Sequence, residues 1–96
     1  MRVLVDKDQI KIVCDRENIA YLGLFGSYAR GEAHKKSDID LLIDFNDTKS
    51  FFQLTKIQEA FENIFKKKVD LVLKDNIKES LKSYILKDLV TLYEKR

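Results

Sequence analysis

Residues 19–32 read IAYLGLFGSYARGE and contain all three glycines of the 96-residue chain, Gly23, Gly26 and Gly31. The first seven of these residues are nearly all apolar and end at Gly26, a pattern typical of a buried strand. Glycine is required where the backbone adopts a positive φ or approaches another group closely. Because glycine occurs only here, the sequence places the candidate site directly after this strand.

The spacing of apolar residues predicts the other elements of the chain. These are helices over residues 7–17, 50–66 and 77–94, a helical turn over 27–30, and strands over 38–45 and 69–73. The helix over 50–66 joins the second and third strands as a crossover, which implies that they are parallel neighbours. The apolar arc of the last helix is wide. It predicts packing between the sheet and the first helix or, alternatively, docking of a partner or a second subunit.

Length and composition predict one folded domain over residues 1–96, because 45% of the residues are hydrophobic and 35% are charged. The longest uncharged run, residues 18–29, is too short to cross a bilayer of about 30 Å. An acid at position 6 interrupts any signal-peptide core, so we expect a cytoplasmic protein without a membrane partner. The net charge of +2 argues against nucleic-acid binding by bulk charge.

Three carboxylates are expected at one edge of the sheet. Asp38 and Asp40 are two residues apart on a strand and therefore share a face, and Asp70 lies near the start of the neighbouring parallel strand. Unpaired carboxylates this close repel one another, and their oxygens suit Mg²⁺ or Mn²⁺. The turn at Gly26 and Ser27 offers N–H groups and a hydroxyl to a phosphate. It reaches the acids only if the first strand is antiparallel to the second, which predicts a mixed three-stranded sheet.

Other polar residues are not assigned to the site. Asp44 shares the face of Asp38 and Asp40 but lies about 13 Å along the strand from Asp40. The lone Cys14 and the lone His34 fall short of a zinc-ligand set, and His34 is expected in an exposed loop. The run over residues 66–68 is three lysines, which fits a solvated helix end.

Three motifs in order resemble the minimal nucleotidyltransferases (MNT) of the DNA polymerase β superfamily. The motifs are Gly26-Ser27-Tyr28-Ala29-Arg30-Gly31, Ser37-Asp38-Ile39-Asp40 and Val69-Asp70. The resemblance covers nearly the whole chain and implies an α/β (α+β) fold, the polymerase-β-type palm core. The loop at Lys35 and Lys36 is more basic than is usual in that family, and either lysine could contact phosphate or an acidic partner surface.

The resemblance also implies roles for individual residues. Gly26 and Ser27 would bind the β- and γ-phosphates of ATP, Asp38 and Asp40 would ligate two Mg²⁺ ions, and Asp70 would complete the metal nearer the nucleophile. Arg30 would contact the triphosphate or, as an alternative, pair with a nearby acid such as Glu32.

The activity implied by the resemblance is transfer of AMP from ATP to a hydroxyl, with pyrophosphate leaving. The chain has no room for an acceptor-binding domain, so another molecule would present the acceptor. The resemblance favours an antitoxin of MNT–HEPN modules that adenylylates a tyrosine of its HEPN ribonuclease partner. Two alternatives stay open: an antitoxin that occludes its partner without catalysis, and a transferase acting on a small molecule or a nucleic-acid end. The sequence also allows a homo-oligomer.

Overall fold

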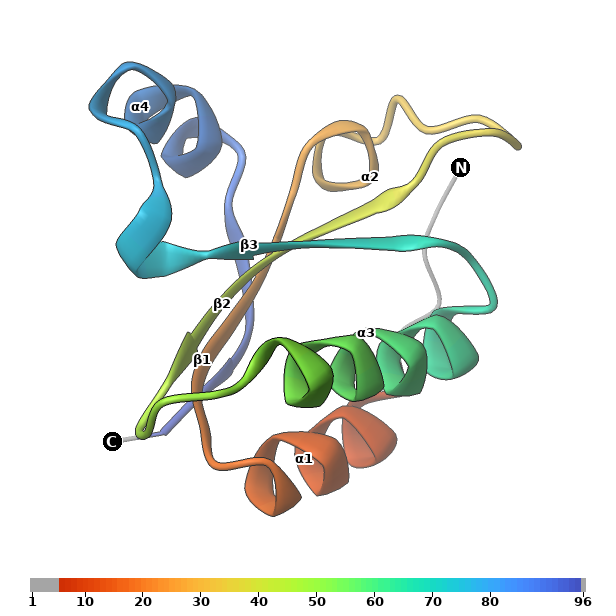
Figure 1. The fold of residues 1–96 in the computed structure, drawn as a ribbon. Helices are drawn as coiled ribbons and strands as arrows, with labels where there is room; N and C mark the ends of the chain where they lie inside the picture. Colours follow the sequence, from red (N-terminus) through yellow and green to blue (C-terminus); the bar gives the residue numbers. More distant parts are fainter. Residues whose placement is uncertain (1–5, 96) are drawn as a thin grey trace.

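The computed structural model describes residues 6–95 and shows a sheet with helices on both faces (Figure 1). Residues 1–5 and 96 of the expected domain lie outside this range. The elements, in chain order, are α1 (Lys7–Arg16), β1 (Ile19–Phe25), α2 (Ser27–Arg30), β2 (Ile39–Phe45), α3 (Phe51–Phe65), β3 (Val69–Leu73), the 3-10 turn η1 (Lys74–Asn76), α4 (Glu79–Lys87) and β4 (Val90–Glu94).

The sheet is mixed, as predicted, but it has four strands in the order β3-β2-β1-β4 instead of three. β1 is antiparallel to β2 and to β4, and β2 is parallel to β3. The predicted helix over 77–94 is therefore wrong in its second half, because α4 ends at Lys87 and residues 90–94 form β4. Pairing with β4 gives hydrogen-bond partners to the backbone groups on the second edge of the apolar β1. A three-stranded sheet would leave those groups unpaired.

The main core lies between one face of the sheet and the helices α1 and α3 (Figure 1). Ile39, Leu41 and Ile43 alternate along β2 and are at most 1% exposed, and they pack in one cluster with Ile57 and Phe61 of α3. Period-2 alternation therefore places Asp40 on the other face of the same strand, as the sequence predicted.

α4 covers that other face, where Ile85 packs with Phe25 and Leu42. The expectation that the last helix packs between the sheet and the first helix is wrong, because these contacts place α4 on the side of the sheet away from α1. Within residues 6–95, no helix combines the length and the apolar character that a membrane span requires.

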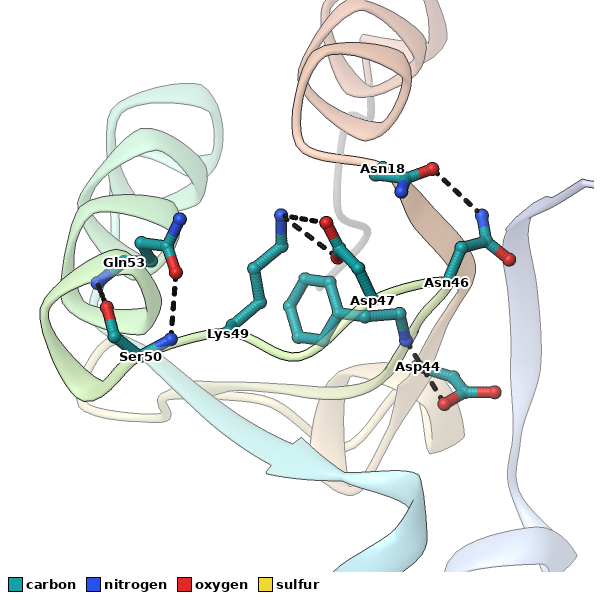
Figure 2. A network of polar contacts seen from close by, with 8 residues as sticks. Asn18, Asp44, Asn46, Asp47, Lys49, Ser50 and Gln53 are labelled. Carbon is teal, nitrogen blue, oxygen red and sulfur yellow. Dashed lines mark hydrogen bonds and ion pairs between the residues drawn. The ribbon is translucent and has the colours of Figure 1, made fainter.

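The helix starts follow from local capping. The Asp6 side chain accepts hydrogen bonds from the N–H groups of Asp8 and Gln9 at 3.1 Å, which fixes the start of α1. Ser50 and Gln53 form a reciprocal capping box that starts α3 (Figure 2). Both helices start within one residue of the bounds that the sequence predicted, 7 and 50.

Candidate active site

The sheet register brings two of the predicted carboxylates side by side. Asp40 of β2 pairs with Asp70 of β3, and Phe25, the last residue of β1, pairs with Asp40 on the other side. The turn at Gly26 therefore leaves the sheet next to Asp40. Asp38 lies two residues earlier, just before β2, so the predicted acids and the glycine–serine turn gather at one end of the sheet.

Gly26 is explained by its closeness to Asp40. Its φ is +78°, and a Cβ built on it would collide with the Asp40 carboxylate, only 3.1 Å from Cγ. Gly31 has a φ of +75° and ends α2, donating its N–H to the carbonyl oxygens of Ser27 and Tyr28. The glycine cluster thus marks two residues with positive φ, as the sequence predicted.

The negative charges of Asp38, Asp40 and Asp70 are not balanced by ion pairs in the described part of the chain. Burial, and then the negative charges of Asp70 and Asp38, raise the pKa of Asp40, while Arg30 opposes the shift. Within residues 6–95, none of these three carboxylates accepts a side-chain hydrogen bond or forms an ion pair. A divalent cation would offset their mutual repulsion, and carboxylate oxygens are the donors that hard cations prefer.

The metal site is not preassembled. No group of three or more His, Cys, Asp and Glu side chains in the described part of the chain is positioned to hold a metal ion. The donor chemistry at Asp38, Asp40 and Asp70 fits such an ion. The side chains would have to converge around it.

Arg30 adopts the alternative that the sequence left open. Its Nε lies 3.1 Å from Glu32 Oε2, and its NH1 group lies 3.1 Å from Asp88 Oδ2. These two hydrogen bonds, that with Glu32 first, raise the pKa of Arg30. The side chain still lines the cleft described next, beside Gly26 and Ser27.

A cleft of about 570 Å³ opens between this end of the sheet and the segment from η1 to α4. Its lining includes Gly26, Ser27, Arg30, Asp40 and Asp70 from the predicted set. The other wall is made by Ile77, Lys78, Leu81 and Tyr84, which sequence reasoning did not assign to the site. The available signal is the wide apolar arc that includes Leu81, which from the sequence predicts packing or docking.

Two side chains of α3 hold the start of β3 in place. Glu62 Oε2 accepts a hydrogen bond from the Val69 N–H at 3.0 Å, and the Gln58 side-chain amide donates to the Val69 carbonyl oxygen at 2.7 Å. We call these residues the α3 clamp. Since Asp70 follows Val69 directly, the clamp fixes the backbone that carries the third carboxylate.

The residues excluded from the site lie apart from it or are satisfied. Asp44 accepts a hydrogen bond from the next N–H and belongs to the opposite end of β2 (Figure 2). His34 is exposed in a loop, where its Nδ1 accepts a hydrogen bond from the Lys36 N–H. Cys14 is fully buried, and burial raises the pKa of its thiol to about 12, so it stays protonated.

Comparison with known proteins supports the resemblance. A family model described as "Nucleotidyltransferase domain" matches residues 7–92. Protein adenylyltransferase MntA of Thermococcus cleftensis is 36% identical over 76 residues, which cover 79% of this chain and 77% of the relative. The chain therefore belongs to the nucleotidyltransferase domain family and is a transferase enzyme.

Solved structures share the fold over nearly the whole chain. A crystal structure of a toxin–antitoxin with AMP-PNP gives a TM-score of 0.78 at 21% identity, covering 96% of this chain and 76% of that one. An MNT antitoxin in complex with a tri-AMPylated HEPN toxin of Shewanella oneidensis gives a TM-score of 0.68 at 19% identity. That match covers 93% of this chain and 70% of the other. At these identities the likeness concerns the fold alone, and it supports the predicted α/β class with a mixed sheet flanked by helices.

Proposed function

We propose that this chain transfers AMP from ATP, with Mg²⁺, to a tyrosine hydroxyl of a HEPN-domain partner and thereby acts as an antitoxin. The observation that carries this proposal is one cleft lined by the Gly26–Ser27 turn together with Asp40 and Asp70. A phosphate-binding turn beside unpaired carboxylates suits a metal-bound triphosphate. The relative named protein adenylyltransferase and the fold shared with an MNT–HEPN complex support the acceptor class.

The residues of the cleft have separable roles in this proposal. The Ser27 hydroxyl and the backbone N–H groups at the start of α2 would hold the phosphates that leave as pyrophosphate. Asp38, Asp40 and Asp70 would hold the divalent cation, which supplies positive charge to the transferring and leaving oxygens when bound. The acceptor hydroxyl forms its bond to the α-phosphorus as the bond to pyrophosphate breaks. No covalent intermediate on the protein is needed.

Arg30 would assist by exchanging partners. In the structure its guanidinium is bonded to Glu32 and Asp88, and its side chain is 28% exposed. A triphosphate in the cleft would compete for the same donors through charge-assisted hydrogen bonds.

The test is transfer of label from α-labelled ATP, in the presence of Mg²⁺, to the product of the adjacent gene or to a lysate protein fraction. We expect labelled partner with the wild type and none with the Asp38→Asn/Asp40→Asn variant. Asp44→Asn is the matched control because it removes a carboxylate from the same strand and should leave labelling intact. Peptide mapping of the labelled partner identifies the acceptor side chain.

Other outcomes would favour the alternatives. A stable complex without label, and with neutralisation that survives Asp38→Asn/Asp40→Asn, would identify an occluding antitoxin. Absence of both label and complex would point to a small-molecule or nucleic-acid acceptor. Replacing Mg²⁺ with Mn²⁺ or with a chelator in the same assay defines the metal requirement.

A further inference from the structure

A second hollow lies at the same end of the sheet and brings together five lysines. It has a volume of about 400 Å³ and is lined by Lys35, Lys36, Ser37, Asp38, Lys66, Lys67 and Lys68. We call it the basic hollow. The two segments that form it meet because β2 and β3 are parallel neighbours that begin at one edge (Figure 1). In the sequence these lysines fitted a solvated helix end and a loop, and the fold joins them.

The basic hollow is tied to the catalytic end of the sheet by specific contacts. Lys67 Nζ donates a hydrogen bond to the Lys35 carbonyl oxygen at 2.9 Å and lies 5.5 Å from the centroid of the Tyr28 ring, next to Ser27. The Ile39 N–H donates to the Lys68 carbonyl oxygen at 2.9 Å. Asp38 lines the hollow, and Asp40, about 7 Å further along the strand, lines the cleft.

The charges of the basic hollow are not compensated by the protein. None of its five lysines forms an ion pair with a residue of the described range, although Lys11 and Lys49 each pair with an aspartate elsewhere. Asp38 is the single carboxylate in the lining. Clustered like charges raise the local positive potential and attract an anionic ligand.

The lining favours carboxylates over nucleic acid. Single-stranded nucleic acid is usually bound with aromatic or arginine side chains that stack on bases, and the hollow offers lysines, one serine and one aspartate. The neighbouring Tyr28 is 7% exposed, so its ring is closed to stacking. Lysines act as flexible point charges, which suits a mobile acidic peptide segment.

We propose that the basic hollow is the acceptor-side docking surface and binds an acidic segment of the protein that receives the nucleotide. This inference rests on the proposed function, because it assumes a protein acceptor. An acidic segment seated beside Asp38 would deliver an adjoining hydroxyl to the neighbouring cleft. The basic hollow would contribute to recognition of the acceptor and leave ATP binding unaffected.

The first test is steady-state transfer with the charge-reversal variant Lys36→Glu/Lys68→Glu. We expect the KM for the acceptor protein to rise about tenfold while the KM for ATP stays unchanged. The control, Lys7→Glu/Lys56→Glu, changes the net charge equally at exposed positions outside the hollow and should leave both constants unchanged. An unchanged acceptor KM in Lys36→Glu/Lys68→Glu, or an equal rise in the control, would overturn the docking surface.

The second test needs no catalysis and separates this inference from the proposed function. Fluorescence anisotropy at low salt compares a labelled polyglutamate peptide with a single-stranded RNA of equal length. We expect the peptide to bind wild type and the control, and to lose affinity for Lys36→Glu/Lys68→Glu. RNA binding without peptide binding, or peptide binding that ignores the variant, would refute the acidic-segment proposal. Absence of AMP transfer by the wild type would instead refute the proposed function. The anisotropy result would then test only whether the basic hollow binds an acidic peptide.

Discussion

The two ends of the sheet use the same residue types in opposite ways. Where β2 leads into α3, polar side chains have partners: Asn18 with Asn46, Asp47 with Lys49, and Ser50 with Gln53 (Figure 2). Where β2 and β3 begin, the three site carboxylates and the lysines of the basic hollow have no ion-pair partner within residues 6–95. Each of these two clusters gathers unpaired charges of one sign, which lowers the stability of the fold. Such an accumulation at one end of the sheet indicates that this end binds ligands.

The largest effect is expected from breaking the catalytic end without touching the paired end. Asp70→Asn should lower the rate of AMP transfer more than about a hundredfold, because a neutral amide cannot supply the third anionic metal ligand. Asp44→Asn on the same sheet should change the rate less than about twofold. Single-turnover assays of both variants measure the difference. Comparable losses would remove the functional distinction between the two ends.

The two glycines that flank α2, Gly26 and Gly31, provide a sharper comparison. Gly26→Ala places a methyl group against the Asp40 carboxylate at a φ of +78°, so transfer should be lost and stability should fall by about 1–3 kcal/mol. Gly31→Ala also has a positive φ but meets nothing within 4 Å, so it should cost only about 1 kcal/mol of strain. Urea denaturation and the transfer assay read the two effects separately. Equal loss of transfer in both would show that strain, and not Asp40, governs the effect.

The paired end should respond in stability and not in activity. The Lys49 side chain is 7% exposed, lies 3.2 Å from Asp47 and stands 5.5 Å from the centroid of the Phe45 ring. Lys49→Ala should therefore lower the free energy of unfolding by about 1–2 kcal/mol with transfer unchanged. The exposed Lys36→Ala should leave stability unchanged, as thermal denaturation of both variants can check. Destabilisation by Lys36→Ala would mean that the basic hollow also supports the fold.

The smallest effect concerns pH and a paired contact between α1 and β4. The Tyr93 hydroxyl donates to Asp15 Oδ1 at 2.7 Å, and this bond raises the pKa of Tyr93 to about 12. Hydrogen bonds from Lys11 and then Tyr93 lower the pKa of Asp15.

The signs of the two shifts define two pH windows. The Tyr93 contribution is full below the unfolded pKa of about 10 and is lost as pH rises toward about 12. The Asp15 contribution is full above its unfolded pKa of about 3.9 and is lost as pH falls through the lower folded pKa. Tyr93→Phe should flatten the alkaline limb of the stability profile. An alkaline limb identical to that of the wild type would contradict this assignment.

The sequence predicted the local features and missed the non-local pairing. The glycine cluster, the parallel β2–β3 pair and the gathering of Asp40, Asp70 and Gly26 were all predicted and are confirmed. Each depends on residues close in sequence or on one short crossover. The missed strand, residues 90–94, pairs with β1 about seventy residues earlier, as in the register of Tyr21 with Glu94.

Periodicity could not separate the two states of the C-terminal segment, because its apolar residues fit a helix as well as a short strand. Two physical signals favoured a strand. The all-apolar β1 is typical of a central position with neighbours on both edges, and Val90-Thr91-Leu92-Tyr93 is rich in β-branched and aromatic residues. The cleft wall at Leu81 and Tyr84 was missed because the position of α4 over the sheet depends on non-local packing, that of Ile85 with Phe25 and Leu42.

The α3 clamp has a consequence for solubility. β3 is an edge strand of the sheet, and an exposed strand edge can template pairing with another chain. Gln58 and Glu62 occupy the N–H and carbonyl groups of Val69, so the first backbone groups of this edge are already bonded to side chains. Gln58 and Glu62 therefore position the backbone next to Asp70 and also hinder strand-to-strand aggregation at the start of β3.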